Sequence, residues 1–228
     1  MFTSAEALCM VQHATSREDW QYLCLNPVSN GIEFRPSSSN SNLYELVFVH
    51  NPDRQPFQSV FKIFPRIDQY ATGDLFSKHP GKQHHWKYEG RKEDMIVFRD
   101  GYHFNPAIHE AIMSVHPAIQ HCIVVGSGMD RPAAVIDLAR RMGIDVESPA
   151  GNEEALDAIW PIISRVNQAV EPRVRLKREM IIFAKRSKPF VVVGMNVQRS
   201  STAGLYDEEL RMTYARAAER GVDEMEID

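Results

Sequence analysis

The run Tyr70-Ala71-Thr72-Gly73-Asp74-Leu75-Phe76 is followed, sixteen residues after Asp74, by the run Gly90-Arg91-Lys92-Glu93-Asp94. The Thr-Gly-Asp sequence indicates a turn that presents the Asp74 carboxylate. Its two oxygens can accept two hydrogen bonds from a vicinal diol such as a ribose. Arg91 can add a charge-assisted hydrogen bond to the same sugar or to a phosphate. The two runs together predict a binding site centred on Asp74.

Size and charge place the chain among globular proteins that have no general affinity for nucleic acid. It has 228 residues, of which 43% are hydrophobic, enough for one large domain or two small ones. The net charge is -4 and the pI is about 6.1, so no overall basic field favours nucleic acid. The basic run from Arg173 to Arg178 is short, and we interpret it as a solvated face or the entry to a strand.

Cysteine use and hydropathy indicate a cytoplasmic protein. Cys9, Cys24 and Cys122 form an odd set without paired spacing, which argues against a disulfide scaffold or a zinc site and fits a reducing compartment. No stretch approaches the roughly 18 apolar residues of a transmembrane helix. The N-terminus lacks a charged region followed by an apolar one, so no secretory signal and no membrane partner are expected.

The first part of the chain reads as β-rich. Residues 43–49 are rich in aromatic and β-branched residues and predict a strand. Residues 79–82 predict a turn, and residues 86–88 predict a short strand. Residues 2–12 are apolar and predict either a strand and turn or a short helix.

The second part mixes strands and helices. Asp100-Gly101 predicts the turn of a β-hairpin over residues 95–104, and Asn105-Pro106 predicts a helix start with Asn105 as its cap. Further elements are expected as strands at 122–126, 133–137 and 180–183, an amphipathic helix at 153–170, and a closing helix from Tyr206 to Arg220 that stops at Gly221. The prediction is an α+β fold with a β-rich part at 1–88 and an α+β part at 89–228, the latter built on a three-stranded sheet.

Several other runs occur in a fixed order along the chain. They are Asp19-Trp20-Gln21-Tyr22, Leu43-Tyr44-Glu45-Leu46-Val47, Phe61-Lys62-Ile63-Phe64-Pro65, His116-Pro117-Ala118-Ile119, Val124-Val125-Gly126 and Val197-Gln198-Arg199. With the two opening runs, this ordered set resembles the C-terminal third of the adenylation domain of fungal peptide-synthetase-like carboxylic acid reductases, a branch of the adenylate-forming enzymes. The resemblance covers nearly the whole chain.

The resemblance implies a role for particular residues. Asp74 would hold the ribose hydroxyls of ATP or AMP, and Arg91 would assist with the nucleotide. Glu93 matches the hinge about which the small lid subdomain rotates, where Asp is usual. Residues 99–102 would face an incoming pantetheine arm, which makes a carrier domain a candidate partner. Phe2-Thr3-Ser4-Ala5-Glu6 is similar to the family's Tyr-Gly-Ser-Thr-Glu motif, which matches Glu6 to a carboxylate associated with Mg²⁺.

Three departures from the family pattern bear on activity. The loop that cradles the ATP phosphates should precede all of these motifs, and the chain begins after it. Most of the large subdomain, including the acid-binding pocket, should precede them together with that loop. In the run similar to Tyr-Gly-Ser-Thr-Glu, Ala5 stands where Thr is expected and Thr3 where Gly is expected. The catalytic lysine of the family falls on Gly194 or, with a shift of one residue, on Met195, so neither alignment supplies a charge. Lys185 and Lys188 lie upstream, at the other end of the loop.

Simpler interpretations remain open for several side chains. Asp74 could only cap its turn, Arg91 could be a surface ion-pair residue, and Glu6 could be solvated. His79, His84 and His85 are expected in an exposed loop rather than at a metal, and His109 is expected on the solvated face of its helix. Cys122 is expected to be an inert core thiol.

Three functions follow as alternatives. The first is a truncated adenylation-domain protein without independent carboxylate-activating activity, linked to fungal secondary metabolism. The second is a lid that acts in trans with a partner chain carrying the missing N-terminal adenylation subdomain. The third is a non-catalytic module that binds a carrier domain or a reductase. The resemblance also implies that the front part is a partial β-barrel with an exposed edge, and such edges favour self-association.

Overall fold

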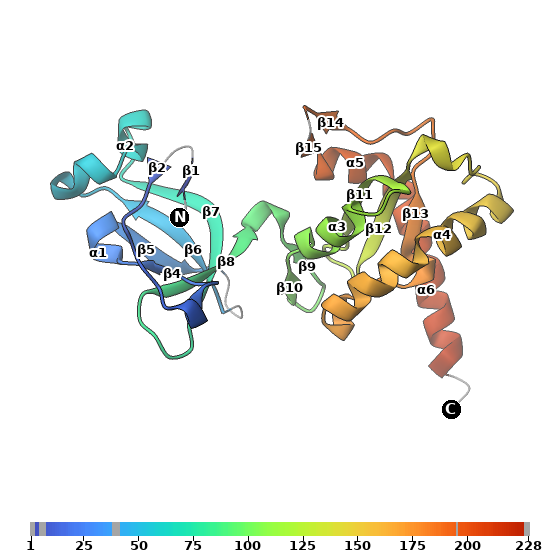
Figure 1. Ribbon diagram of the computed structural model, residues 1–228, viewed down its shortest axis with the longest axis horizontal. Helices are drawn as coiled ribbons and strands as arrows, with labels where there is room; N and C mark the ends of the chain where they lie inside the picture. The colour runs from blue at the N-terminus through green and yellow to red at the C-terminus, as the bar shows by residue number, and fades with distance from the viewer. Residues whose placement is uncertain (1–2, 5–7, 38–41, 195, 226–228) are drawn as a thin grey trace. The chain divides into compact units, whose positions relative to one another are not determined.

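The computed structural model describes residues 3–4, 8–37, 42–194 and 196–225 (Figure 1). The chain divides into two compact units, Met1–Met95 and Ile96–Asp228, and each is described by itself. The sequence-based boundary between residues 88 and 89 falls inside strand β8 (His85–Arg91). This strand stays paired with β7 (Gln69–Lys78) as far as Arg91, so the first unit extends beyond that boundary.

The first unit is built on a six-stranded antiparallel sheet. Its strand order is β3 (Gln12–His13), β4 (Leu23–Leu25), β8, β7, β6 (Leu43–Val49) and β5 (Ile32–Pro36). The strand expected at 43–49 is confirmed, and the short strand expected at 86–88 is part of the longer β8. This sheet is the partial barrel expected for the front part.

Short elements complete the first unit. A second antiparallel pair consists of β1 (Thr3–Ser4) and β2 (Leu8–Cys9), so the described part of residues 2–12 is extended rather than helical. Two single-turn helices follow, α1 (Pro27–Asn30) and α2 (Val60–Ile63). Asn26 caps α1 and Gly31 ends it with φ of 61°, the left-handed conformation that glycine adopts readily.

The core of the first unit is one cluster of side chains from its sheet and from α2, and the edge strand β5 is blunted. Leu25, Leu46, Phe48 and Phe76 are fully buried in one cluster. The edge strand β5 carries an ion pair between Arg35 and Glu33 at 2.6 Å and ends in Pro36. Charges and proline on an edge disfavour strand pairing between molecules. Self-association therefore stays a prediction, and β5 gives it little support.

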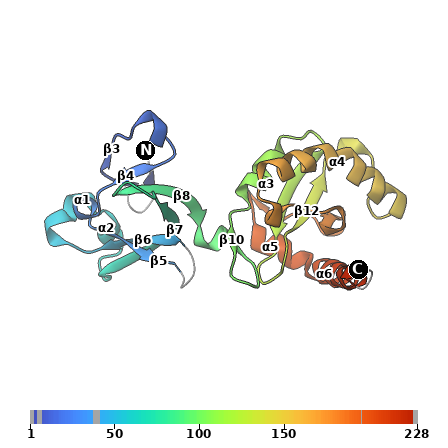
Figure 2. The same cartoon turned by 90° about the horizontal axis from the view of Figure 1, so that it is seen from below.

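The second unit is built on a three-stranded sheet, as expected. Its order is β11 (Ile119–Val125), β12 (Ala133–Leu138) and β13 (Ile181–Phe183), with β11 antiparallel and β13 parallel to β12. Figure 2 shows α3 (Ala107–Ser114) and α4 (Pro149–Ala169) on one side of β12, and α5 (Arg199–Leu205) and α6 (Asp207–Met225) on the other. Two hairpins, β9 (Ile96–Val97) with β10 (His103–Phe104) and β14 (Val192–Val193) with β15 (Asn196–Val197), complete it.

Strand alternation divides the core of this unit in two. Ala134 and Ile136 of β12 belong to the cluster that includes α4, whereas Val135 belongs to the cluster that includes α6. In β13, Ile181 and Phe183 face α4 while Ile182 faces α6. Successive side chains of a strand point to opposite faces, so a sheet covered on both faces needs the continuous apolar runs seen in these strands.

Two expectations about helices are wrong. The closing helix does not stop at Gly221 but continues to Met225, because one glycine costs only about 1 kcal/mol in a helix and does not end it without a left-handed conformation. His109 does not lie on a solvated face. It is 1% exposed, and its Nε2 lies 2.7 Å from the carbonyl oxygen of Val174. The segment that covers α3 there comes from far along the sequence.

Candidate functional site

The Thr-Gly-Asp run forms a bulge in β7. Ala71 pairs with Val47 and Leu75 pairs with Glu45, so residues 72–74 all face the single residue Leu46 on β6. Gly73 at the centre has φ of 76°, a region that residues with a side chain rarely adopt. Bulges interrupt pairing and redirect side chains, and here the bulge ends with Asp74 opposite β8.

Thr72 holds this bulge together. Its hydroxyl donates to the carbonyl oxygen of Leu46 at 3.0 Å and accepts from the amide of Asp74 at 3.0 Å. These two bonds serve main-chain groups that the interrupted ladder would otherwise pair, and buried main-chain groups need such partners. The threonine is therefore structural, and it orients the residue that follows Gly73.

The Asp74 carboxylate lies at the rim of the sheet core, with 8% of the residue exposed. The hydroxyl of Tyr88 on β8 donates to its Oδ1 at 3.4 Å. Burial, and then the nearby charge of Asp74, raise the pKa of Tyr88 to about 12. Tyr88 is therefore a neutral donor beside the carboxylate at every physiological pH.

Arg91 lies opposite Asp74 in the β7–β8 register. Its Nε is 3.9 Å from Asp74 Oδ1 and 3.1 Å from Glu93 Oε1, and its Nη2 donates to the carbonyl oxygen of Thr72 at 3.1 Å. The guanidinium therefore joins three parts of the site. Side-chain exposures of 47% for Arg91 and 62% for Glu93 leave both within reach of a ligand.

The residues present fit the sugar of a nucleotide. A Cβ at Gly73 would lie 3.3 Å from Glu93 Oε2 and 3.6 Å from Arg91 Nη2, so these side chains lie over the glycine. A carboxylate beside a guanidinium and a phenol can accept from a sugar diol and donate to a neighbouring anion. Asp74 and Arg91 are the residues that would hold such a sugar. Thr72 and Tyr88 were not singled out from the sequence, although Thr72 belongs to the opening run.

The remaining residues of interest lie at other places in the chain. Glu93 lies in the 3-10 turn Lys92–Asp94, immediately before the division between the units, and its hinge role stays a prediction. Glu6 and Met195 lie outside the described residues, so the Mg²⁺ expectation for Glu6 gains no geometry. Gly194 is described, with φ of 63° in the turn between β14 and β15.

Lys185 and Lys188 both form ion pairs with Glu209 within the second unit. Lys185 Nζ lies 3.0 Å from Glu209 Oε1, and Lys188 Nζ lies 2.7 Å from the same oxygen. Burial would raise the pKa of Glu209, but the hydrogen bonds from Lys188 and Lys185 outweigh it and lower that pKa to about 2. Neither lysine is available as a replacement for the charge that Gly194 lacks.

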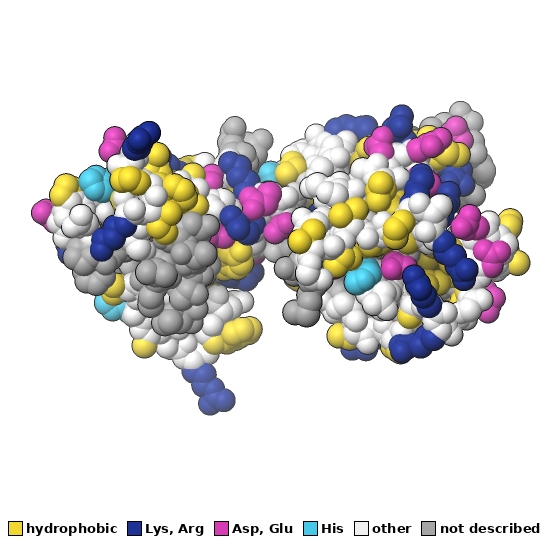
Figure 3. All heavy atoms as spheres, turned by 90° about the horizontal axis from the view of Figure 1, so that it is seen from above, with side chains coloured by type: hydrophobic (Ala, Val, Ile, Leu, Met, Phe, Trp, Pro, Cys, Tyr) yellow, Lys and Arg dark blue, Asp and Glu magenta, His cyan; other side chains and the backbone are white. Residues whose placement is uncertain are grey.

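Other candidate groups have structural partners. Burial raises the pKa of the Cys122 thiol to about 12, so it is protonated. Arg173 pairs with Asp100, and Arg178 lies 3.3 Å from Glu153 and 2.8 Å from Asp157. On the face drawn in Figure 3, basic and acidic side chains of the second unit are interspersed.

Neither a metal site nor a membrane-spanning helix is found in the part of the chain that the structure describes. No group of three or more His, Cys, Asp or Glu side chains in it could hold a metal ion. No helix in it combines the length and the apolar character that crossing a bilayer requires.

An ion pair that the sequence did not indicate anchors the second unit. Arg199, in the Val-Gln-Arg run, donates to both carboxylate oxygens of Glu110 at 2.5 and 2.9 Å and to the carbonyl oxygen of Val124 at 2.9 Å. Glu110 also accepts from the amide of Val124 at 2.8 Å. This network joins α3, β11 and the start of α5, and thus fixes one end of the hairpin that contains Gly194.

A six-stranded antiparallel sheet with the Asp74 carboxylate at its bulge, followed by a small α+β unit, fits the C-terminal region of an AMP-binding enzyme. The chain belongs to this family: residues 93–218 match the family described as AMP-binding enzyme C-terminal domain. The matched region begins at Glu93, after Asp74 and Arg91, so the roles of these two residues stay predictions.

Fungal enzymes are among the relatives. The chain is 31% identical over 209 residues to a carboxylic acid reductase of Neurospora crassa, covering 91% of this chain and 19% of that protein. It is 29% identical over 221 residues to the adenylate-forming reductase Nps10 of Heterobasidion annosum, covering 96% and 20%. The chain therefore spans about a fifth of the length of these relatives.

Solved structures share the fold. The A domain of a carboxylic acid reductase from Segniliparus rugosus, in complex with AMP and a co-purified carboxylic acid, matches with a TM-score of 0.53 and 16% identity, covering 81% of this chain and 30% of that one. The A-PCP didomain of carboxylic acid reductase from the same organism, in complex with AMP, matches with a TM-score of 0.52, 16% identity, and coverage of 85% and 28%.

Proposed function

We propose that this chain supplies the ribose-binding strand pair and the lid of an adenylate-forming domain, and that by itself it binds AMP weakly without forming an acyl adenylate. The observation that carries the proposal is the bulge that sets Asp74 opposite Arg91. Asp74 accepts from the ribose diol, and Arg91 donates to the ribose or to the α-phosphate. Glu93 is the hinge residue, and Mg²⁺ would enter with ATP, with Glu6 as its candidate ligand.

The lack of a cation at the catalytic position supports weak binding without chemistry. The family lysine stabilises charge that develops between the carboxylate and the α-phosphate, and loss of one such donor costs about 3–4 kcal/mol. Gly194 has no side chain, and Met195 is uncharged. Lys185 and Lys188 remain bound to Glu209. Because the chain keeps Asp74 and Arg91 but lacks the lysine charge at residue 194 or 195, we expect it to bind AMP without forming an acyl adenylate.

AMP binding by saturation-transfer NMR and calorimetry tests this function. A few charge-assisted hydrogen bonds of about 1.5–3 kcal/mol each are opposed by the cost of association, so we expect a Kd of about 1 mM or weaker. Asp74→Ala should abolish binding, whereas Asp53→Ala, with the same charge change at an exposed residue of the same unit, should leave it intact. Micromolar binding, or equal loss in both variants, would refute the assignment.

Pyrophosphate exchange tests the second half of the proposal. The purified chain should give no exchange above background with a panel of aromatic and aliphatic carboxylic acids, because it offers no cation at residue 194 or 195. Exchange above background with any acid would overturn the non-catalytic reading. Exchange that appears only after addition of a chain carrying the remaining adenylation subdomain would favour the lid acting in trans.

A second candidate function is docking of a carrier domain. Its support is the loop at residues 99–102, where Asp100 pairs with Arg173 and the Tyr102 hydroxyl donates to Glu171 at 2.6 Å. These contacts hold the loop in a defined shape, as a docking surface requires. The fungal reductases among the relatives extend this candidate to secondary metabolism. Titration with a pantetheine-loaded carrier protein should shift the amide signals of residues 99–102, and unchanged signals would reject it.

A further inference from the structure

The carboxylate of Glu93 lies within the site formed by Asp74 and Arg91. Its Oε1 is 3.1 Å from Arg91 Nε, and its Oε2 is 3.3 Å from the position that a Cβ at Gly73 would take. The same carboxylate therefore contacts the guanidinium and covers the glycine of the bulge. An anion that belongs to this chain thus holds the place beside Arg91 that an anionic ligand would need.

Arg91 has a second anchor that does not depend on Glu93. Its Nη2 donates to the carbonyl oxygen of Thr72 at 3.1 Å, and this carbonyl belongs to the bulge in β7. A guanidinium carries five N–H donors in a fixed planar arrangement, of which the hydrogen bond to Thr72 uses one. Arg91 can therefore exchange the carboxylate of Glu93 for another anion and keep its position over the bulge.

The position of Glu93 in the chain allows its side chain to leave. It lies in the 3-10 turn Lys92–Asp94, and its side chain is 62% exposed. The next residue toward the N-terminus, Lys92, has its Nζ 3.2 Å from Glu45 Oε2 on β6, so this second ion pair holds the turn when Glu93 rotates away. Exposed ion pairs such as Arg91–Glu93 are weak, and a competing anion can therefore break this one.

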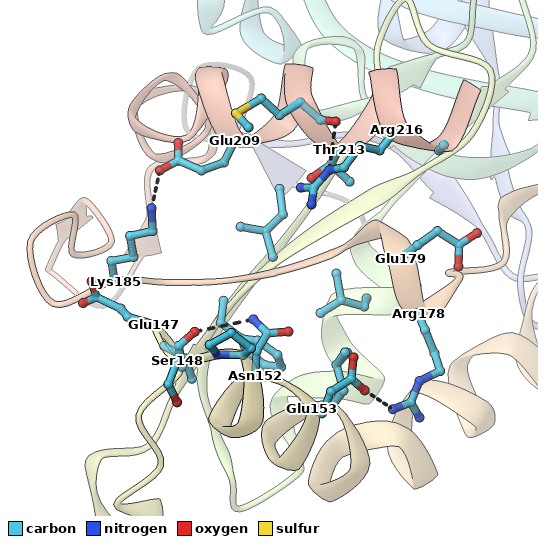
Figure 4. A pocket seen from close by; sticks show the side chains of 18 residues that line it. Glu147, Ser148, Asn152, Glu153, Arg178, Glu179, Lys185, Glu209, Thr213 and Arg216 are labelled. Atoms are coloured by element: carbon cyan, nitrogen blue, oxygen red, sulfur yellow. Dashed lines mark hydrogen bonds and ion pairs between the residues drawn. The ribbon is translucent and has the colours of Figure 1, made fainter. Parts of the chain in front are cut away.

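The ion pairs of the second unit do not offer the same exchange. A groove of about 690 Å³ lies between α4 and α6, and Figure 4 shows Lys185 at this groove donating to Glu209 of α6. Glu209 also binds Lys188, and its side chain is largely buried. A carboxylate held by two cations away from solvent is harder to displace than the exposed carboxylate of Glu93.

A phosphate is the part of a nucleotide that can replace Glu93. A phosphate monoester carries about -1.5 to -2 charges at pH 7 and forms short, charge-assisted hydrogen bonds with a guanidinium. A ribose hydroxyl is neutral and would not compensate for the loss of an ion pair. Because the carboxylate and a phosphate at Arg91 would repel each other, binding of the phosphate requires Glu93 to move away.

We infer that Glu93 determines the specificity of the nucleotide site by competing with the nucleotide phosphate for Arg91. In the free protein the carboxylate of Glu93 occupies the guanidinium, and the phosphate displaces it on binding. The inference rests on the proposed function of Asp74 and Arg91. It adds that binding of a nucleotide releases the side chain of Glu93 from the sheet of the first unit, so occupancy of the site and the freedom of the turn Lys92–Asp94 are linked.

NMR titration of the full chain with AMP and with adenosine tests the inference. Glu93→Gln should bind AMP about two- to fivefold more tightly than the wild type, because the competing charge is gone. Its affinity for adenosine, which has no phosphate, should stay unchanged. Asp94→Asn is the matched control: it removes the same charge from the same exposed turn, and Asp94 is not among the described ion-pair partners of Arg91. The control should tighten AMP binding less than Glu93→Gln does.

Side-chain signals give a readout that does not depend on affinity. In the wild type, AMP should shift the Nε–H signal of Arg91 and the carboxyl-carbon signal of Glu93, since their contact is exchanged for one with the phosphate. Adenosine at equal occupancy should leave the Glu93 signal in place. A Glu93 signal that ignores AMP would show that the carboxylate stays on Arg91.

The outcomes separate this inference from the proposed function. Equal AMP affinity in Glu93→Gln and Asp94→Asn, weaker AMP binding in Glu93→Gln, or tightening of adenosine as large as that of AMP would each overturn the inference. In all three cases, loss of AMP binding in Asp74→Ala would leave the proposed function standing. AMP binding that survives Asp74→Ala, or no AMP binding by either the wild type or Glu93→Gln, would overturn both.

Discussion

Arg91 lies directly across the β7–β8 ladder from Asp74, with its Nε 3.9 Å from Asp74 Oδ1. The same guanidinium contacts Thr72 and Glu93, so it joins the bulge in β7 to the turn that ends the first unit. A nucleotide that engages Asp74 would meet Arg91 without any rearrangement of the sheet. The geometry therefore depends on the bulge, which substitutions at Gly73 and Thr72 can examine.

Gly73→Ala should destabilise the first unit. An alanine at φ of 76° costs about 1–2 kcal/mol, and its Cβ would also lie 3.3 Å from Glu93 Oε2. Urea denaturation monitored by the first unit's tryptophans measures the change. Gly101→Ala, followed by urea unfolding of the second unit through Trp160, is the control for backbone strain alone, since Gly101 has φ of 85° but no atom within 4 Å of a built Cβ. An equal or larger loss at Gly101 would mean that only backbone strain matters at Gly73.

Thr72→Val should destabilise the same unit by about 1–3 kcal/mol, because an isosteric side chain would leave the Leu46 carbonyl and the Asp74 amide without their partner. AMP binding should weaken with it, because Asp74 would lose its orientation. Thr72→Ser, which keeps the hydroxyl, should restore most of both properties. If the serine variant is as unstable as the valine variant, the hydroxyl is not what holds the bulge.

Arg199→Ala should destabilise the second unit by about 2–4 kcal/mol. The reason is that Glu110 would keep its charge in a site with 20% side-chain exposure after losing its cation. Unfolding in urea measures the loss. The double variant Arg199→Ala with Glu110→Ala should lose less than the sum of the single variants. Additive losses would show that the pair is not coupled.

Stability of the second unit should fall as pH falls below about 6.5. Burial lowers the pKa of His109 below its ordinary value of 6.5, against a smaller opposing effect of the hydrogen bond to Val174. The unfolded chain therefore binds a proton more readily than the folded chain. The stabilisation is fully present above pH 6.5 and is lost progressively below it. The free energy of unfolding is measured against pH for the wild type and for His109→Gln. The difference between the two profiles removes the contribution of the carboxylates, which both proteins share. If the variant loses stability below pH 6.5 as steeply as the wild type, His109 is not the cause.

Several features could be predicted from the sequence because neighbouring residues along the chain cause them. The strand at 43–49 follows from its apolar and β-branched content, and the hairpin around Asp100-Gly101 follows from the turn chemistry. The helix expected at 153–170 was found as α4, which begins earlier because Ser148 caps it through the amide of Gly151. Asp74 could be proposed as a site residue because the Thr-Gly-Asp turn is compact in sequence.

Features that depend on contacts between distant segments could not be predicted from the sequence. His109 is buried because residues near Val174 cover it, 65 residues along the chain. Arg199 and Glu110 lie 89 residues apart, yet they form the bidentate pair that anchors the loop containing Gly194. No local pattern encodes such pairings.

The sequence by itself determined the composition of the site: a glycine for the bulge, a carboxylate at Asp74, a guanidinium at Arg91 and no cation at Gly194. It also determined in which segments apolar and polar residues alternate and which segments are apolar throughout, because this periodicity depends only on neighbours along the chain. Only the tertiary structure decided that Arg91 faces Asp74, that Lys185 and Lys188 bind Glu209, and that a groove lies between α4 and α6. Strand register and packing decide these relationships, and they act between residues that are close in space but remote in sequence.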